Sequence, residues 1–161
     1  MMARQFSLPE IIPPVELLPP AADAGGRTSR YVKLGKLDKA FIVCHVNQGN
    51  AATVQLTPLQ AQDTLGTGAK PITATQVWTD LNEAALDLLT KQVNAANVVT
   101  DAGIASKVVV FEISPQDCMD MANGFNTIAI QTGASNAANI TEAMIYGLHR
   151  YQQAQPPSIL S

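Results

Sequence analysis

The stretch Lys39–Gln60, KAFIVCHVNQGNAATVQLTPLQ, decides the fold that the sequence predicts. Apolar residues recur at every second position in its first half, and this period of two predicts a β-strand. A second alternating run surrounds Leu56, and the residues Asn47-Gln48-Gly49-Asn50 between the two runs have the composition of a turn. We therefore expect a β-hairpin, which is marginal on its own in water and needs a larger sheet.

Further strands are expected on both sides of this stretch, at residues 31–34, 72–78, 107–113, 125–132 and 140–149. The segment 107–113, KVVVFEI, is apolar on both faces, which is typical of a strand in the centre of a sheet. The last two strands are separated by small residues and are expected to form a second hairpin.

Two segments have helical features. Residues 81–92, LNEAALDLLTKQ, have leucines at helical spacing behind Asp80 as a possible N-cap. We expect one short helix or helical turn followed by a strand, and a strand at residues 88–93 alone is the alternative. Ser114 followed by Pro115 predicts a single helical turn. Seven or eight short strands with at most one or two short helices predict an all-β fold, an antiparallel β-sandwich of jelly-roll-like type. We expect an extended arm at residues 1–26, the sandwich at 27–151 and an extended tail at 152–161.

The first 26 residues contain five of the ten prolines, so that a regular helix is excluded there. The arm is nevertheless too apolar for typical disorder. Its apolar residues are expected to bind a partner surface, and they are Leu8, Ile11, Ile12, Val15, Leu17 and Leu18. The partner surface is expected on a neighbouring subunit, and folding back onto the arm's own domain is the alternative.

The composition favours an assembly subunit. Charged residues make up only 14% of the chain, against about 25% in ordinary domains, and a weakly charged surface is easily desolvated against another protein. A net charge of -3 with scattered basic residues argues against nucleic-acid binding. No apolar run is long enough for a membrane span, and no signal peptide is recognisable, so that synthesis in a cytoplasm is expected.

Residues of chemical interest form no catalytic or metal-binding motif. Cys44 and His45 are adjacent in a strand and therefore point to opposite faces, which prevents them from acting as a nucleophile and base pair. Both cysteines, Cys44 and Cys118, are expected to be buried apolar side chains. The sequence GTGAK ends in Lys70 but lacks the glycine and hydroxyl residue that flank the lysine of a P-loop. We expect no enzyme, no cofactor and no metal.

Three stretches carry a resemblance to a known family: SRYVKLGKLDKAFIVCHVNQG (29–49), ATVQLTPLQAQDTLGTGAKPIT (52–73) and VVVFEISPQDCMDMANGFNTIAIQTGASNAANITEAMIYGLHRY (108–151). Over roughly residues 23–151 the chain resembles small virion structural proteins of tailed bacteriophages. The resemblance implies a capsid decoration or cement subunit on the head surface, a homotrimer or homodimer that bridges major capsid proteins. The alternatives are a neck, tail or fibre-base component of the virion and, in another class, a β-sandwich ligand-binding module.

Overall fold

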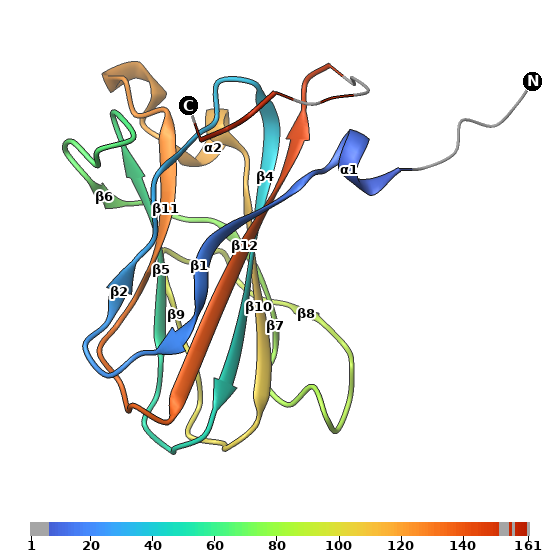
Figure 1. Cartoon of the computed structure of the whole chain (residues 1–161), viewed down its shortest axis with the longest axis vertical. Coiled ribbons are helices and arrows are strands. Elements are labelled where there is room, and N and C mark those ends of the chain that lie inside the picture. The colour runs from blue at the N-terminus through green and yellow to red at the C-terminus, as the bar shows by residue number, and fades with distance from the viewer. Residues whose placement is uncertain (1–6, 152–154, 156, 161) are drawn as a thin grey trace, which may run out of the picture.

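The computed structural model describes residues 7–151, 155 and 157–160, and it shows two antiparallel β-sheets packed face to face (Figure 1). Sheet A contains, in spatial order, β1 (Pro14–Ala22), β12 (Asn139–His149), β4 (Leu37–Gln48), β10 (Ser106–Ile113), β7 (Gln76–Asp80) and β8 (Thr90–Lys91). Sheet B contains β2 (Arg27–Thr28), β11 (Thr127–Thr132), β5 (Gln55–Ala61) and β6 (Lys70–Pro71); β3 (Val32–Lys33) also pairs with β11, and β9 (Val98–Val99) with β5. The predicted all-β sandwich is confirmed.

Helices are few and short among the described residues. They are α1 (Leu8–Ile11), α2 (Pro115–Cys118) and the 3-10 turn η1 (Met121–Asn123). Helix α2 follows Ser114 and has Pro115 in its first turn, as the sequence predicts. No helix in the described part of the chain has the length and apolar character needed to cross a membrane.

The core lies between the two sheets and follows from strand alternation. Along β4 every second side chain from Ala40 to Val46 is fully buried, and β10 contributes Val109, Phe111 and Ile113. The facing sheet supplies buried side chains of its own, Leu56, Ile128 and Ile130. Strand β10 lies between β4 and β7, which confirms the central position expected for residues 107–113.

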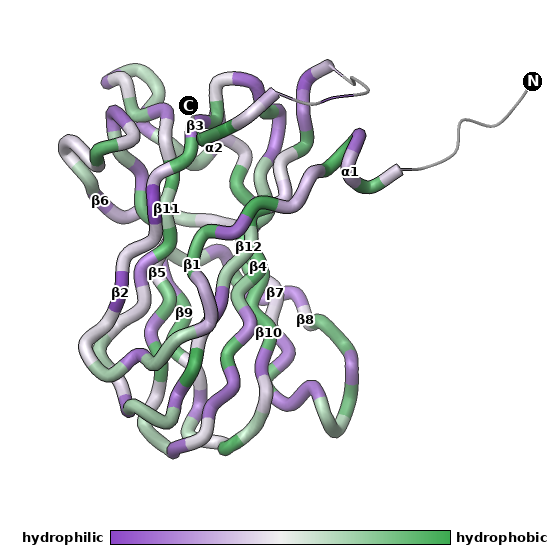
Figure 2. The backbone as a smooth tube through the Cα atoms, in the orientation of Figure 1, coloured by the Kyte–Doolittle hydropathy of each residue, from purple (hydrophilic) through white to green (hydrophobic). Residues whose placement is uncertain are grey.

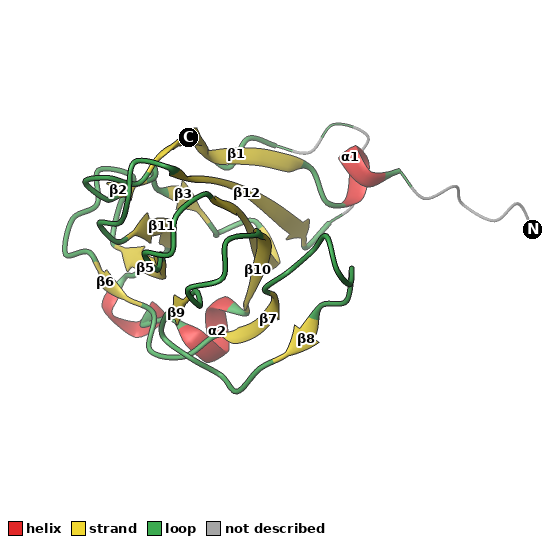
Figure 3. Cartoon of the chain, turned by 90° about the horizontal axis from the view of Figure 1, so that it is seen from below, coloured by secondary structure: helices red, strands yellow, loops and turns green. Residues whose placement is uncertain are grey.

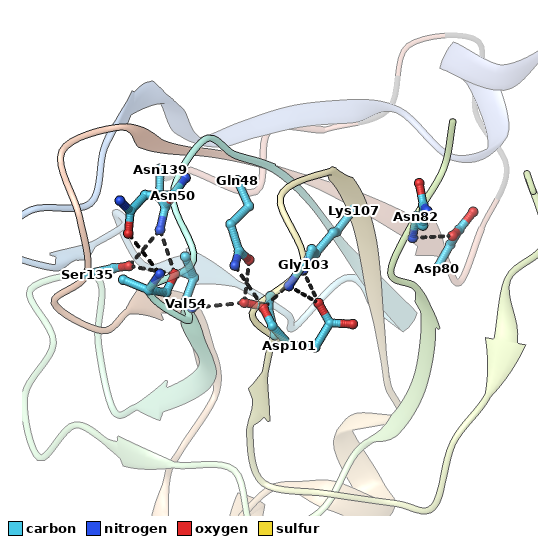
Figure 4. Close-up of polar contacts among 12 residues, drawn as sticks. Gln48, Asn50, Val54, Asp80, Asn82, Asp101, Gly103, Lys107, Ser135 and Asn139 are labelled. Carbon is cyan, nitrogen blue, oxygen red and sulfur yellow. Dashed lines mark hydrogen bonds and ion pairs between the residues drawn. The ribbon is translucent and has the colours of Figure 1, made fainter. Parts of the chain in front are cut away.

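The two hairpin predictions are wrong, because each connection joins one sheet to the other. Strand β4 pairs with β12 and β10, whereas β5 pairs with β11, β6 and β9. Strands β11 and β12 are likewise in different sheets. The two crossing loops are tied together at one end of the sandwich: the backbone N–H of Asn50 donates to Asn139 Oδ1 at 2.8 Å, and Asn139 Nδ2 donates to the Ala52 carbonyl at 2.7 Å (Figure 4).

Residues 81–92 form no regular helix, and the expected alternative form, a helical turn followed by a strand, is close to what the structure shows: the N–H groups of Ala85 and Leu86 donate to the Asn82 carbonyl, and β8 follows. Asp80 Oδ1 accepts the N–H of Asn82 at 3.0 Å, as a capping residue would, but only a turn follows. The leucines of this segment find no core, since Leu86 and Leu88 are 62% and 59% exposed. Strand β8 occupies only Thr90–Lys91, so that the alternative of a strand over all of residues 88–93 is wrong.

The predicted arm divides in two. Residues Pro14–Ala22 form β1, which pairs with β12 of the same domain, and Leu17 and Leu18 are buried in the core. The domain therefore begins before residue 26, where the sequence places the end of the arm. Leu17 and Leu18 do not bind a neighbouring subunit as expected, and for Pro14–Ala22 the alternative, that the arm folds back onto its own domain, is correct. Prolines are tolerated here because β1 is an edge strand, and its pairing shifts register between Glu16 and Leu18 and again between Leu18 and Ala21.

The carboxylate of Asp23, fully buried directly after β1, joins the two sheets. Asp23 Oδ1 accepts hydrogen bonds from Thr132 Oγ1 in β11 at 2.9 Å and from the Arg27 guanidinium at 3.1 Å. Asp23 Oδ2 accepts a hydrogen bond from the hydroxyl of Thr141 in β12. We call this set of four residues the Asp23 clamp. The Arg27 guanidinium also donates to the Ala21 carbonyl at 2.9 Å, which replaces ladder bonds that β1 lacks.

A buried lysine fixes a loop at the same end of sheet A (Figure 4). The side chain of Lys107 is fully buried and contacts the carboxylate of Asp101, which is itself half exposed. Lys107 Nζ also donates to the Asp101 carbonyl at 3.0 Å, and Gln48 Nε2 donates to the same carbonyl at 2.8 Å. The hydrogen bond from Lys107, and after it the N–H of Gly103, hold the pKa of Asp101 below its usual value.

We expect Asp23→Ala to lower the free energy of unfolding by about 3 kcal/mol, because Arg27 and two hydroxyls would lose a buried acceptor. Urea unfolding followed by circular dichroism measures this change. The control Asp38→Ala removes an exposed carboxylate and is expected to cost less than about 0.5 kcal/mol. Equal effects of the two substitutions would contradict the role of the clamp.

We expect Asp101→Asn to destabilise the protein at pH 7, and we expect this effect to decrease as the pH falls below about 4. A carboxyl whose pKa is depressed by folding stabilises the protein above its unfolded pKa of about 3.9, and this contribution is lost as the pH falls through the folded pKa. Denaturant unfolding of both proteins across this pH range provides the test. A gap in unfolding free energy that stays constant from pH 7 to pH 3 would refute the pairing with Lys107.

Candidate functional site

The outward side of sheet A carries a continuous set of apolar side chains. We call it the apolar face, and it consists of Phe41, Val43, Trp78, Val108, Val110, Met144 and Tyr146. Cross-strand pairing places these residues side by side: Val110 is opposite both Val43 and Trp78, and Phe41 is opposite Tyr146. All seven are partly exposed, because each belongs to the strand positions that alternate with the buried core.

Sheet B has no comparable open face. Every residue of β5 except Gln55 is buried, and so is every residue of β11 except Gln131. Two neighbouring strands that are buried on both sides must be covered on the side away from the core. The apolar face of sheet A is therefore the open side of the sandwich, and its aromatic and methionine side chains are of the types enriched in protein interfaces.

One border of the apolar face is formed by Glu112 and its partners. Trp78 Nε1 donates to Glu112 Oε2 at 3.1 Å, and Lys39 Nζ donates to Glu112 Oε1 at 3.2 Å. Partial burial alone would raise the pKa of Glu112, but these two hydrogen bonds and the nearby lysine charges outweigh it and lower the pKa. Lys91 lies over the Trp78 ring at 5.9 Å.

His45 marks the opposite border. Its Nε2 lies 3.3 Å from a carboxylate oxygen of Glu83, and its Nδ1 lies 3.4 Å from one of Glu142. The three side chains are between 40% and 45% exposed. Polar groups thus limit the apolar face at both ends of the strands.

A protruding loop, residues 81–94, flanks the apolar face beyond β7. We call it the flap, and Figures 1 and 3 show it standing away from the sandwich. Its exposed apolar residues are Leu86, Leu88, Leu89 and Val93, and Figure 2 shows hydrophobic segments along it. A groove of about 340 Å³ lies between the flap and the end of β7. The flap extends the apolar surface past the edge of the sheet.

The predicted partner-binding residues fall into two groups. Leu17 and Leu18 are core residues, and Val15 is half buried against the core. Leu8 is 40% exposed, while Ile11 and Ile12 are half buried, and α1 contains no buried residue. Only Leu8, Ile11 and Ile12 thus remain as candidates for contact with another chain.

The side chains with reactive potential lie apart from one another. Burial, with a smaller contribution from the charge of Asp23, raises the pKa of the Cys44 thiol far above its ordinary value. Burial and the nearby Lys36 lower the pKa of His149, whose Nε2 has no hydrogen-bond partner among the described residues. No group of three or more His, Cys, Asp or Glu residues that could hold a metal ion occurs in the part of the chain that the structure describes.

The apolar face was missed from the sequence although its signal was present. The apolar alternation in Phe41 and Val43, and the two-sided apolar character of residues 107–113, are the pattern of a sheet with a second apolar face. Such a pattern is usually explained by a central strand that is covered on both sides, and this explanation does not predict an open face. The class of protein that the fold and this face define is an antiparallel β-sandwich with one open apolar sheet face.

No protein-family model matches the sequence, and no curated protein matches it. The fold is similar to the crystal structure of the SPBc2 prophage-derived protein YomS, with a TM-score of 0.43 and 8% sequence identity, covering 83% of this chain and 93% of that chain.

We expect the two thiols to differ in their reaction with a thiol reagent such as DTNB. Cys44 is fully buried with a raised pKa, whereas Cys118 is only half buried. Native Cys118→Ser protein should therefore react only when it unfolds, and native Cys44→Ala protein should react at a measurable rate. Rapid reaction of folded Cys118→Ser protein would contradict the burial of Cys44.

Proposed function

We propose that this protein is a structural subunit of a bacteriophage virion, a capsid decoration or cement protein that bridges major capsid proteins on the head surface. The observation that carries the proposal is the open apolar face of sheet A, centred on Val43 and Val110. An open face of this kind needs a partner in the working state of the protein, because contiguous exposed apolar surface marks sites of association. The sequence resemblance to small phage virion proteins and the low content of charged residues support the same role.

The size of the apolar face favours weak, repeated contacts. Seven side chains, each occupying about 4.8 Å across the strands and about 6.8 Å along them, give a face of roughly 230 Å². Covering it contributes about 6 kcal/mol at about 25 cal/mol per Å², while association costs about 4 to 15 kcal/mol. One copy alone would bind weakly, whereas many copies on a lattice, each linked to several neighbours, gain avidity.

The runner-up in the same class is a neck, tail or fibre-base component, which would use the same face. A ligand-binding module is less favoured by the chemistry of the face. Phe41 and Tyr146 are neighbours, but Trp78 is separated from them by β10, and its indole N–H already donates to Glu112. Few polar groups remain there to orient a polar ligand.

The decisive measurement is the number of copies in purified virions, obtained by quantitative mass spectrometry against the major capsid protein. We expect on the order of hundreds of copies, as an icosahedral surface lattice requires. About six or twelve copies would indicate the neck or tail instead, in line with the rotational symmetry of those parts. Absence from virions would refute both structural roles.

We also expect Val110→Lys to prevent incorporation into virions while the isolated protein keeps its fold. A lysine at this position projects outward and would place an unpaired charge in the interface. The matched control is Gln131→Lys, which adds the same charge to an exposed position of sheet B. Incorporation of both variants at the level of the unmodified protein would exclude the apolar face as the contact surface.

A further inference from the structure

We propose that the apolar face of sheet A receives residues 8–13, LPEIIP, from a second copy of this chain. The inference rests on the proposed role as an assembly subunit and names the partner of its open face. It joins two apolar features that lie outside the buried core, the start of the described chain and the outward side of sheet A.

The donor segment is apolar and contributes no residue to the buried core. Helix α1 is four residues long, buries none of its residues and has no side-chain hydrogen bond at its N-cap. A helix of one turn is marginal in water, so that the segment can rearrange when it docks. Leu8 is 40% exposed, and Ile11 and Ile12 are partly exposed.

The donor segment ends where the fold begins. From Pro14 onward the chain is paired with β12, and the Arg30 guanidinium donates to the Glu16 carbonyl at 2.6 Å. The Asp23 clamp holds the far end of β1. An exchange of the whole of β1 between copies would break these contacts, whereas an exchange of residues 8–13 breaks none of them.

The receiving face has the chemistry that proline-rich segments select. Proline rings pack against exposed aromatic side chains, and aromatic grooves are the usual receptors for such segments. The apolar face presents Phe41, Trp78 and Tyr146 for this purpose. The donor contains Pro9 and Pro13, and its isoleucines can pack on the aliphatic side chains between the rings.

Charge complementarity orients the donor. Glu10 is the one charged residue of the segment, and it is exposed. Lys91 is exposed beside the Trp78 ring and forms no ion pair with any described residue, while Lys39 is shared with Glu112. Docking with Glu10 toward Lys91 would place the prolines over the aromatic part of the face and keep them away from the acidic border at Glu83 and Glu142.

The geometry favours a second copy over the chain's own face. Strand β1 is at one edge of sheet A and pairs with β12, so that Pro14, opposite Tyr146, leaves the donor segment at the margin of its own apolar face. Figures 1 and 3 show α1 leading away from the sandwich beyond the end of β12. A segment leaving in this direction is placed to reach a neighbouring molecule, and the contact joins unlike surfaces of the two copies.

The test uses the full chain and a truncated protein that lacks residues 1–12. All core residues, from Leu17 on, remain in the truncated protein, so that it is expected to fold. We expect the full chain to associate with increasing concentration in sedimentation velocity and the truncated protein to remain monomeric. Identical sedimentation of the two proteins would overturn the inference. If the full chain is monomeric and its Trp78 emission differs from that of the truncated protein at every dilution, the segment docks on its own chain, and this result would overturn the inference as well.

A synthetic peptide of residues 1–13 tests the receiving face directly. Trp78 is the single tryptophan of the chain and lies in this face, so that its fluorescence reports binding. We expect a saturable change on titration into the truncated protein, and at least tenfold weaker binding for the peptide with Ile11→Asp and Ile12→Asp. Equal binding of the two peptides would overturn the inference.

Variants of the truncated protein locate the site. Val110→Lys should weaken peptide binding at least tenfold, whereas Gln131→Lys on sheet B should leave it unchanged. Equal effects would show that the peptide binds elsewhere. If the protein binds the peptide but is absent from virions, only the proposed function is refuted. If it is present in virions but does not bind the peptide, only this inference is refuted.

Discussion

The buried carboxylate of Asp23 is the interaction on which the arrangement of the chain depends. It lies between the two sheets and accepts hydrogen bonds from Thr132 of sheet B and Thr141 of sheet A, with Arg27 as its counter-ion. A buried carboxylate is stable only when its oxygens are satisfied, so that the sheets and the end of β1 must be placed together. The clamp therefore fixes the C-terminal end of β1 between the two sheets, and the pairing of β1 with β12 brings the chain into the fold from Pro14 on.

Sheet A then has two apolar sides with different uses. The residues of β4 and β10 that point inward belong to the core, and the residues of the same strands that point outward belong to the open apolar face. Sheet B buries both of its sides within one chain. A protein with few charged residues cannot easily cover a second apolar side with its own polar groups, and burial against another molecule is the physical alternative.

The sequence predicts the strands and the fold class well because alternation is local. Alternation from Ala40 to Val46 identifies β4, and Ser114 with Pro115 identifies α2. Alternation does not determine which strand pairs with which. A turn such as Asn47–Asn50 can close a hairpin or can lead the chain to the facing sheet. The Asp23 clamp joins residues more than 100 positions apart in the chain, and no local pattern reports it. The open face was visible in the sequence only as an excess of apolar residues, because exposure depends on what the rest of the chain covers.

The edges of sheet A explain why contact through the face is favoured over growth of the sheet. At one edge β1 carries Pro19 and Pro20 and shifts register twice, which interrupts the row of free backbone groups. At the other edge β8 is only two residues long and lies beside the flap. Short or proline-containing edge strands resist pairing with further strands. With both edges blocked, and with the apolar face limited by Glu112 at one end and His45 at the other, the geometry that remains for specific association is a partner laid across the strands.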